Sequence, residues 1–380
     1  MANEVLNEER REVRRVRPED YGPVDGDCTQ TFQNMLNNIR EWYNLLHDSH
    51  DQYLLKAMTT IELSREYTIS GTLDMGPNRP IMFGLVWQGV NKYLTEIVHT
   101  GDGDLFRIDD CWLGLRFRDI SFRSTNSAGS FMYTRAQNGP QDFIFTNCAW
   151  RGSWFRGLTL DGDNINSEFG FNNCTVGGSY EEAWMWSGSA DGVDQQDQFL
   201  NYWFNDCKVE YEYGDFLHYD RGGFIKVSGG SYIILSEHPK GTPSTFFVML
   251  HQHHFDGVQK LSVRDVRFEL RNALSRAIYC EWENCHVTFD GCSDTANAFK
   301  EHSKELVSHH YYNPGCVRYV NCDLVGKHQY DDYQPGERPA RQQIVYDQCS
   351  HSNNATRDTF IVSNGTPPNV KFRDDANGIE

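Results

Sequence analysis

A short pattern recurs along most of this chain and constrains its fold more than any other feature. Apolar residues are followed closely by Asn, Asp or Gly and often then by Cys, as in Thr146-Asn147-Cys148-Ala149-Trp150. With the Asn, Asp or Gly position as register, the marks fall at residues 119, 147, 173, 206, 230, 265, 291, 321 and 348. The steps of 24 to 35 residues are typical of a solenoid whose coils differ by loop insertions. Asn284-Cys285 also fits the pattern, so one coil stays ambiguous.

The stacking of coils explains why this pattern repeats along the chain. Each coil supplies short strands with alternate side chains pointing inward, and equivalent residues of successive coils lie about 4.8 Å apart. Inward Cys, Val and Phe then form columns, while Asn and Asp at the turns form hydrogen-bonded ladders. A β-sandwich is the weaker interpretation, because it gives turns every 8 to 12 residues or so and no register of coil length. The sequence therefore predicts an all-β parallel β-helix, a solenoid of about ten coils.

The start of the repeat region predicts a helix over residues 29–47. Thr29 is a suitable N-cap. Apolar residues then recur every three or four positions and form one stripe: Phe32, Met35, Leu36, Ile39, Trp42 and Leu46. A helix here covers the first coil, which would otherwise leave an open edge.

The segment of residues 17–33 also carries a family resemblance. It contains Asp20-Tyr21-Gly22, then the turn Gly26-Asp27, then a Thr that leads into a helix with Gln. This opening resembles that of pectin-lyase-like β-helices of the phage tailspike and tail-fibre type. Ser64-Arg65-Glu66 departs from the family, which usually has a proline–glycine turn there. The resemblance implies a right-handed parallel β-helix over residues 17–362 and says little about chemistry, because the fold hosts lyases, hydrolases and inert adhesins.

Two segments flank the expected β-helix domain. Residues 1–16 alternate Glu and Arg and have no place in a coil, so we expect an arm that docks onto a larger assembly, with a frayed tail as the alternative. Residues 363–380 are expected to form a C-terminal tail. The first residues are charged rather than apolar, so no secretory signal is expected.

Charge and composition exclude several partners. The formal net charge is −18, and residues 161–220 hold thirteen Asp or Glu against Lys208 alone, a local net charge of −12. Such a surface repels DNA, so no nucleic-acid binding is expected, and it disfavours a polyanionic sugar. Mean hydropathy is −0.63 and no apolar run approaches the roughly 18 residues of a membrane span, so no membrane insertion is expected. The eleven cysteines show no CxxC spacing and are expected to be reduced and buried.

Aromatic residues are dense between residues 150 and 220, which hold five of the nine tryptophans. Aromatic faces beside carboxylates suit a groove for neutral sugar rings, whereas packing under long loops or a subunit interface is the plainer interpretation. The candidate carbohydrate-binding residues are Trp150, Trp154, Trp184, Trp186, Tyr211 and Tyr213.

Carboxylates in the same region leave catalysis open. Glycoside hydrolysis needs two carboxyl groups about 5 to 9.5 Å apart, one of them protonated. Outward residues of neighbouring coils could supply such a pair, but no pair stands out, and solvated acidic loops are the alternative. The candidates are Asp161, Asp163, Glu181, Glu182, Glu210, Asp215 and Asp220. The characteristic catalytic motifs of pectate lyases and polygalacturonases are not found in the sequence.

Histidines form two clusters, His251 with His253 and His254, and His309 with His310. His251 and His253 would share one face of a strand, as two metal ligands require. No third ligand has an evident spacing, so polar surface or interface histidines are the expectation, with no metal and no cofactor.

These features together predict a phage virion protein of the tailspike or tail-fibre type that recognises a host surface polysaccharide. We expect it in the virion, made in the host cytoplasm, as a homotrimer that contacts other tail proteins through residues 1–16. A polysaccharide depolymerase acting as a glycoside hydrolase is the first alternative. A purely structural decoration or adaptor protein of the virion is the second.

Overall fold

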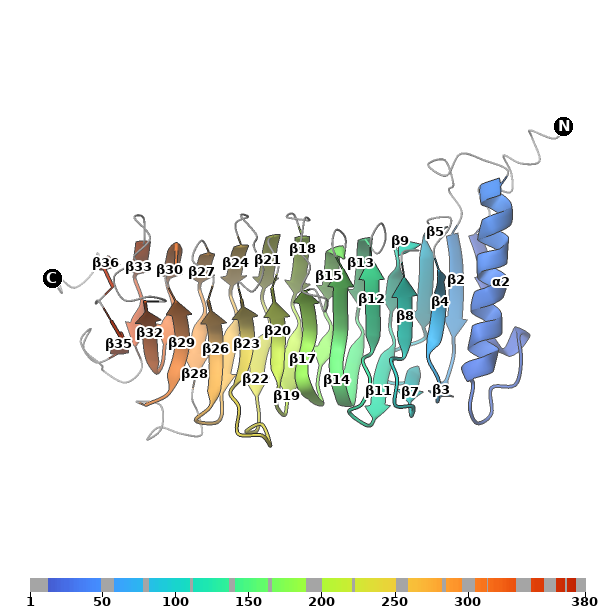
Figure 1. Ribbon diagram of the computed structural model, residues 1–380, viewed down its shortest axis with the longest axis horizontal. Coiled ribbons are helices and arrows are strands. Elements are labelled where there is room, and N and C mark those ends of the chain that lie inside the picture. Colours follow the sequence, from blue (N-terminus) through green and yellow to red (C-terminus); the bar gives the residue numbers. More distant parts are fainter. Residues whose placement is uncertain are drawn as a thin grey trace. The chain divides into compact units, whose positions relative to one another are not determined.

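Short parallel strands joined by turns make up nearly all of the computed structural model (Figure 1). It describes residues 13–48, 58–77, 82–109, 112–136, 141–162, 166–188, 200–220, 223–250, 259–281, 285–295, 305–312, 314–332, 343–351, 360–365 and 368–373. The chain divides into two units, Met1–Gly178 and Ser179–Glu380. Each is a parallel β-solenoid, so the predicted fold class is confirmed.

In the first unit, three rows of strands run through successive coils. The first row is β1 (Val13–Val16), β2 (Met58–Leu63), β6 (Leu85–Gly89), β10 (Arg116–Arg118), β13 (Gln141–Thr146) and β15 (Ser167–Asn172), with β5 (Met82–Phe83) and β9 (Trp112–Leu113) beside it. The second row is β3 (Glu66–Ile69), β7 (Glu96–His99), β11 (Ser121–Thr125) and β14 (Ala149–Gly162), with β16 (Thr175–Val176) after it. The third row is β4 (Leu73–Pro77), β8 (Phe106–Asp109) and β12 (Met132–Ala136). Its last strand, β12, pairs with the second half of the long β14.

The second unit repeats the three rows. The first is β18 (Leu200–Asn205), β21 (Gly223–Ser228), β24 (Gln259–Arg264), β27 (His286–Asp290), β30 (Cys316–Val320), β33 (Gln343–Asp347) and β36 (Val370–Arg373). The second is β19 (Lys208–Tyr211), β22 (Ser231–Ile234), β25 (Arg267–Leu270), β28 (Ser293–Thr295), β31 (Asp323–Leu324) and β34 (Ser350–His351). The third is β17 (Ser179–Gly188), β20 (Asp215–Tyr219), β23 (Ser244–Met249), β26 (Ser275–Cys280), β29 (Val307–Tyr312), β32 (Lys327–Asp331) and β35 (Ile361–Val362).

The repeat marks of the sequence are the corner residues between the first and second rows. A left-handed backbone, with φ between 50° and 64°, is found at Asp119, Asn147, Asp206, Asp265, Gly291, Asn321 and Gln348, and also at Asn173. Asn, Asp and Gly adopt this conformation at the least steric cost, which is why they recur. The mark placed at 230 is wrong by one residue, because Gly229 is the corner that aligns with Asp206. Gly291 is the corner that aligns with Asn321, and Asn284 lies outside the described residues.

Side chains at these corners interact as predicted. The Asn147 amide donates to the Asp119 carboxylate across neighbouring coils at 2.6 Å, which is a rung of a ladder. Cys148 and Cys174 are buried, and each thiol faces the carbonyl oxygen two residues earlier at 3.5 Å. The cysteines of the described residues form no disulfide; they are buried as expected, except that Cys316 and Cys349 are half-buried.

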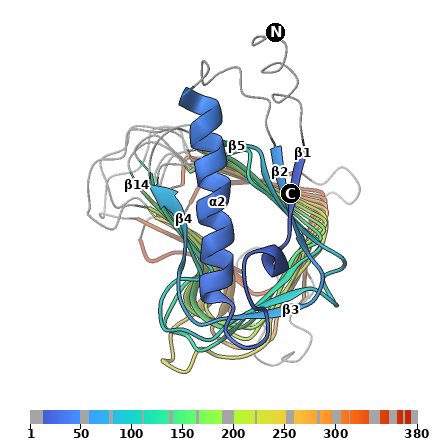
Figure 2. The same cartoon turned by 90° about the vertical axis from the view of Figure 1, so that its right-hand side faces the viewer.

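The helix α2 (Thr29–Asp48) lies across the first coil of the first unit (Figure 2). Phe32, Met35, Leu36 and Ile39 are at most 1% exposed, as predicted, and Tyr43 is buried while Trp42 is only half-buried. Thr29 does not act as a simple N-cap: its hydroxyl donates to Asp27 and accepts from the backbone N–H groups of Ser70 and Gly71. The helix is therefore fixed to the coil by both apolar and polar contacts.

Strands also lie in the two flanking segments, beyond the expected limits of the domain. β1 pairs with β2 although its residues were assigned to the arm, and β36 pairs with β33 although its residues were assigned to the tail. Parallel pairing satisfies the backbone groups of an otherwise open sheet edge. The short 3₁₀ helix η1 (Pro18–Asp20) follows β1. Among the described residues, no helix is apolar and long enough for a bilayer span.

Candidate functional site

The aromatic residues that were predicted to line a sugar groove lie mainly inside the coils. In the first unit, Trp150 and Trp154 are 0% exposed and pack against Phe131. In the second unit, Trp184 stacks on Phe216 at 5.0 Å, and Tyr211 is also fully buried. A ring with no exposed surface cannot stack on a sugar, so the prediction is wrong for these four residues. They fill the solenoid because their strand positions point inward.

The remaining two predicted aromatics are closer to the surface of the second unit. Trp186 of β17 is 8% exposed, and Tyr213 is half-buried against the ring of His238 at 4.8 Å. Trp186 is in register with His218 of β20. Of the six predicted residues, Trp186 and Tyr213 are therefore the ones that a ligand could approach.

The predicted carboxylates do not form one group. Asp161, in the first unit, is 3% exposed and accepts a 2.6 Å hydrogen bond from Tyr133. Burial is the main cause that raises the pKa of Tyr133, and the hydrogen bond to Asp161 and the charge of that carboxylate raise it further. Glu181 forms an ion pair with Lys240 at 2.8 Å, and Glu210 with Lys208 at 2.6 Å, both on the surface of the second unit. Asp163 lies outside the described residues.

Asp215 has the environment that best suits acid–base chemistry. Its Oδ1 accepts a 2.9 Å hydrogen bond from the Thr245 N–H, and its Oδ2 lies 3.7 Å from Nδ1 of His218. Burial raises the pKa of Asp215, and the charge of Glu182 adds to this, against the lowering influence of His218 and Thr245. A carboxyl group with a raised pKa keeps its proton closer to neutral pH, as a general acid must.

Asp215 and His218 of β20 lie two coils before a group of outward side chains on the third row of the second unit, with Val248 of β23 between them. Tyr279 of β26 is in register with Val248 of β23 before it and with His310 of β29 after it. The alternate neighbours Cys280 and Tyr311 are 0% exposed, so these two rows of side chains face opposite ways. We name the outward group the acidic-aromatic ridge: Asp215, His218, Arg276, Tyr279, Glu281, His310, Tyr312 and Asp331.

Ring contacts hold the middle of the acidic-aromatic ridge together. Tyr279 lies 5.2 Å from His310 and 6.0 Å from Tyr312, centroid to centroid, and His310 lies 4.7 Å from Tyr312. The Arg276 guanidinium is 5.5 Å from the centre of the Tyr279 ring. The Tyr279 hydroxyl donates to Glu281. Tyr279, Glu281 and Tyr312 remain partly exposed, so the ridge presents rings, carboxylates and hydroxyls side by side.

Asp331 lies at the far end of the acidic-aromatic ridge, and its carboxylate has several hydrogen-bond partners. It accepts hydrogen bonds from the Asn364 N–H at 2.9 Å and from the Gln329 amide at 2.5 Å, and His310 Nε2 lies 2.9 Å away. Burial alone would raise the pKa of Asp331, but these hydrogen bonds outweigh it and lower the pKa. Asp331 is therefore ionised while Asp215, at the other end of the ridge, holds its proton more tightly.

Five residues of the ridge were not predicted from the sequence: Arg276, Tyr279, Glu281, Tyr312 and Asp331. Only the strand register brings these side chains together: Tyr279 aligns with Val248 and His310, whereas the buried Tyr219 and Tyr330 align with the inward Cys280. His309 and His310 were expected at the surface or an interface, but they are buried, with 0% and 7% exposure, and the His251 cluster lies outside the described residues.

The structure also describes a groove on the first unit. It lies on the outer side of β1, β2, β6 and β10 and has a volume of about 530 Å³. Arg15, Arg116, Arg118, Glu62 and Gln88 are among the residues that line it. Glu62 is already paired with Arg15 at 3.3 Å, and Arg116 contacts Asp142, outside the lining, at 2.5 Å. The groove offers cationic side chains but no rings on which a sugar could stack.

No protein-family model matches this chain, and no curated protein sequence matches it. Among solved structures, it is similar to the enzymatically active domain of bacteriophage CBA120 tailspike protein 2, with 11% identity, 97% of this chain and 47% of that chain covered, and a TM-score of 0.44. It is also similar to full-length tailspike protein 2 from an Escherichia coli O157:H7 bacteriophage (10% identity, 92% and 47% covered, TM-score 0.42). The catalytic domain of a GH87 α-1,3-glucanase gives 12% identity, coverage of 96% and 68%, and a TM-score of 0.46.

This chain thus spans about half the length of the two tailspike chains that it matches. At identities of 9 to 12% the likeness extends to the fold alone.

Proposed function

We propose that this protein is a β-solenoid of the phage tailspike type, within the pectin-lyase-like class, that recognises a host surface polysaccharide through the acidic-aromatic ridge. The observation that carries the proposal is the cluster of Tyr279, His310 and Tyr312, whose rings lie 4.7 to 6.0 Å apart on the outside of the coil. Partly exposed rings beside carboxylates match the apolar faces and hydroxyl rims of sugar units.

Charge narrows the kind of polysaccharide. The acidic-aromatic ridge holds Asp215, Glu281 and Asp331 against the single guanidinium of Arg276. A strongly anionic polymer would be repelled, whereas a neutral one can accept hydrogen bonds from Arg276 and donate its hydroxyls to Glu281. We therefore propose a neutral glycan as the ligand.

The setting of this activity is also part of the proposal. The cap motif of residues 17–33, which resembles that of tailspike β-helices, supports a place in the virion, a homotrimeric assembly and contact with other tail proteins through residues 1–16. Sedimentation of the purified protein and its detection in purified particles test these three points.

Binding is tested by removing the rings. The double variant Tyr279→Ala with Tyr312→Ala is expected to weaken binding to at least one member of a panel of purified bacterial surface polysaccharides and α-1,3-glucan by about tenfold or more, since stacking on each ring contributes roughly 1 kcal/mol. Tyr93→Ala is the matched control, because Tyr93 is 74% exposed and lies in the first unit. Equal binding by the parent, the double variant and the control would contradict the proposal and favour a purely structural virion protein.

A second candidate function, glycoside hydrolysis, is favoured by the pair Asp215 and Glu182. Ala183, next to Glu182, is in register with Asp215, so the two carboxylates come from neighbouring strands, and each position is open enough for partial exposure. Asp215 with its raised pKa would protonate the leaving oxygen, and Glu182 would act as base or nucleophile.

New reducing ends released from the bound polysaccharide would show this activity. Asp215→Asn should then abolish release while leaving binding within about twofold, since an amide keeps the shape of the carboxyl group but cannot donate its proton. Glu210→Gln is the matched control, because Glu210 lies on the adjacent row in an ion pair with Lys208. Binding without release in the parent protein would leave recognition as the function and exclude hydrolysis.

A further inference from the structure

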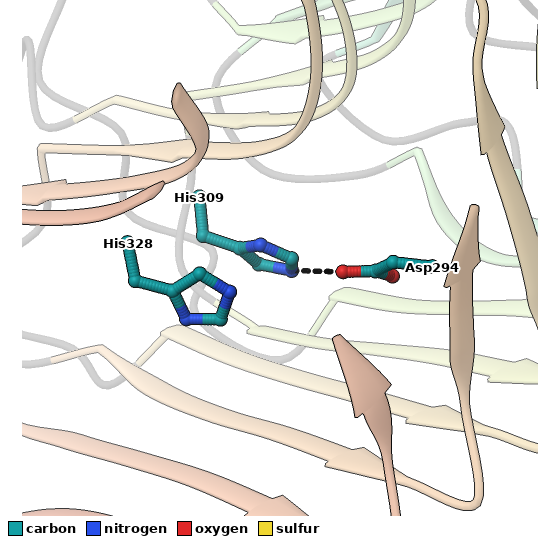
Figure 3. A group of neighbouring side chains, drawn as sticks. All are labelled: Asp294, His309 and His328. Carbon is teal, nitrogen blue, oxygen red and sulfur yellow. Dashed lines mark ion pairs between the residues drawn. The ribbon is translucent and has the colours of Figure 1, made fainter. Parts of the chain in front are cut away.

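Three titratable side chains meet on the inner side of the second unit. Asp294 of β28, His309 of β29 and His328 of β32 are 4%, 0% and 0% exposed. Each side chain offers one atom that could bind a metal ion, and these three atoms all lie within 4.8 Å of one another. Figure 3 shows the His309 ring pointing at the Asp294 carboxylate, with the His328 ring beside it. The ring centroids of the two histidines are 4.1 Å apart.

Each of these side chains has a buried polar atom with no protein partner. Asp294 Oδ2, His309 Nε2 and His328 Nε2 make no hydrogen bond to any described residue. The shortest separation, 3.6 Å between His309 Nε2 and Asp294 Oδ2, is too long for a direct hydrogen bond. Buried polar atoms are almost always satisfied in native proteins, so three orphaned atoms facing one space indicate an occupant between them.

The other ring nitrogen of each histidine is held by a hydroxyl group. His309 Nδ1 lies 3.1 Å from Ser308 Oγ, and His328 Nδ1 lies 2.8 Å from the Tyr346 hydroxyl. If each Nδ1 donates its proton to that oxygen, the lone pair of each ring is on Nε2. This arrangement, with the second nitrogen fixed by an oxygen, is the usual setting of a metal-binding histidine.

We propose that Asp294, His309 and His328 form a buried structural site for one divalent transition-metal ion, with zinc as the best match. Two imidazole nitrogens and one carboxylate oxygen are ligands that zinc prefers, whereas magnesium and calcium prefer oxygen alone. In a tetrahedral zinc site with bonds of 2.0 to 2.1 Å, ligand atoms are about 3.3 Å apart. The 3.6 Å between His309 Nε2 and Asp294 Oδ2 is close to this value. Small side-chain rotations would bring the ligand atom of His328 to a similar distance.

The role of this site is structural rather than catalytic. All three ligands are enclosed by the coil, so no polymer can reach them, and the ion would be acquired as the coil closes during folding. The ion would link β28, β29 and β32, which belong to two rows of strands and successive coils. The site therefore stands independently of the acidic-aromatic ridge and of the proposed function.

Metal content of the whole protein gives the direct test. Protein made without a histidine tag and purified without chelator is expected to hold about one zinc ion per chain by mass spectrometry of the metal. Asp294→Asn and His328→Gln should each reduce this to below about a tenth, since a two-ligand site holds zinc weakly. His286→Gln, at an exposed position of β27, is the matched control and should keep the ion. Replacement by cobalt should give the visible absorption of a four-coordinate site.

Refolding separates a metal from other occupants, and it does not depend on any variant. Protein unfolded and refolded with a chelator should melt roughly 5 °C below protein refolded with zinc at a thousand times its Kd. Adding excess zinc to the unfolded, chelator-treated protein before refolding should restore the higher melting temperature. A parent protein that contains no transition metal, and that melts at the same temperature after refolding with zinc or with chelator, overturns the proposal and assigns the space to water.

Discussion

The same inward position carries three successive phenyl rings in the first unit, whereas in the second unit two successive rings at this position, between Phe289 and Phe372, are phenols. Phe117, Phe145 and Phe171 stack with centroids 4.9 and 5.0 Å apart and planes within 3° of parallel. Tyr319 and Tyr346 stack at 4.8 Å with planes 9° apart. Each of these residues stands two positions before a left-handed corner. The stacking is therefore the same, and the hydroxyl groups are the difference.

The hydroxyls change what the interior must provide. Tyr319 bonds to the hydroxyl of Tyr311 and Tyr346 to that of Tyr330, both at 2.7 Å, and Tyr346 also lies 2.8 Å from His328. The phenyl column needs only to be filled, because it has no polar atoms to satisfy. The phenol column needs partners inside the coil, and those partners include a histidine of the proposed metal site. A single backbone design thus accepts an apolar or a polar interior.

Removing a ring from the phenyl column should have the largest effect. Phe145→Ala deletes the ring between Phe117 and Phe171 and leaves a cavity, so we expect a loss of about 3–5 kcal/mol in the free energy of unfolding, measured by denaturant titration. Phe155→Ala is the control, since Phe155 lies on the next strand with 39% exposure and should cost about 1 kcal/mol or less. Equal losses would mean that stacking does not distinguish inward from outward rings.

Adding a hydroxyl to the phenyl column should cost somewhat less. Phe145→Tyr introduces a polar atom among aromatic neighbours such as Phe131 and Trp150, with extra volume as well. We expect a loss of roughly 2–4 kcal/mol, from an unpaired hydroxyl and overpacking together. A neutral result in the same titration would show that the first unit accepts polar atoms as readily as the second, and would break the comparison.

Removing a hydroxyl from the phenol column gives the reverse test. Tyr346→Phe keeps the stack but leaves the Tyr330 hydroxyl and His328 Nδ1 without their partner, so we expect a loss of about 1–3 kcal/mol. Tyr93→Phe, at a 74% exposed position, should change stability by roughly 0.5 kcal/mol or less. If Tyr346→Phe stabilises the protein, the hydroxyl network is not needed and the two interiors are equivalent.

The smallest effect is expected where a polar group is fully satisfied at the surface. Asp27 accepts hydrogen bonds from the Ser70 and Thr29 hydroxyls at 2.6 Å and from both backbone N–H groups at 3.1 Å. Burial opposes ionisation, but these bonds outweigh it and lower the pKa of Asp27 from 3.8 to about 2. The carboxylate therefore stabilises the fold above pH 3.8 or so, and this contribution is lost as the pH falls toward 2.

Melting curves between pH 5 and pH 2 measure that contribution. The melting temperature of Asp27→Asn should lie a few degrees or less below that of the parent at pH 5, and the gap should close as the pH falls. A gap that stays constant down to pH 2 contradicts the assigned hydrogen bonds.

Local requirements made much of the fold predictable from the sequence. A corner with positive φ favours Asn, Asp or Gly whatever its surroundings, so residues such as Asn147 and Asp265 could be placed before the structure. Helix periodicity placed Phe32 and Leu36 against the first coil for the same reason. The error at residue 230 arose where two glycines are adjacent and either can adopt the corner conformation.

Which side of a strand faces inward was decided only by the tertiary structure. Phe216 and Leu217 are consecutive and both buried, so the coil does not keep strict alternation, and the inward positions of Trp184 and Tyr211 could not be read from their spacing. His309 and His310 are neighbours in the sequence, yet one belongs to the buried site and the other to the outer ridge. The residue type at a corner is determined by the backbone conformation of that residue itself. The environment of an inward side chain depends instead on residues of other coils, which stacking brings within a few ångströms.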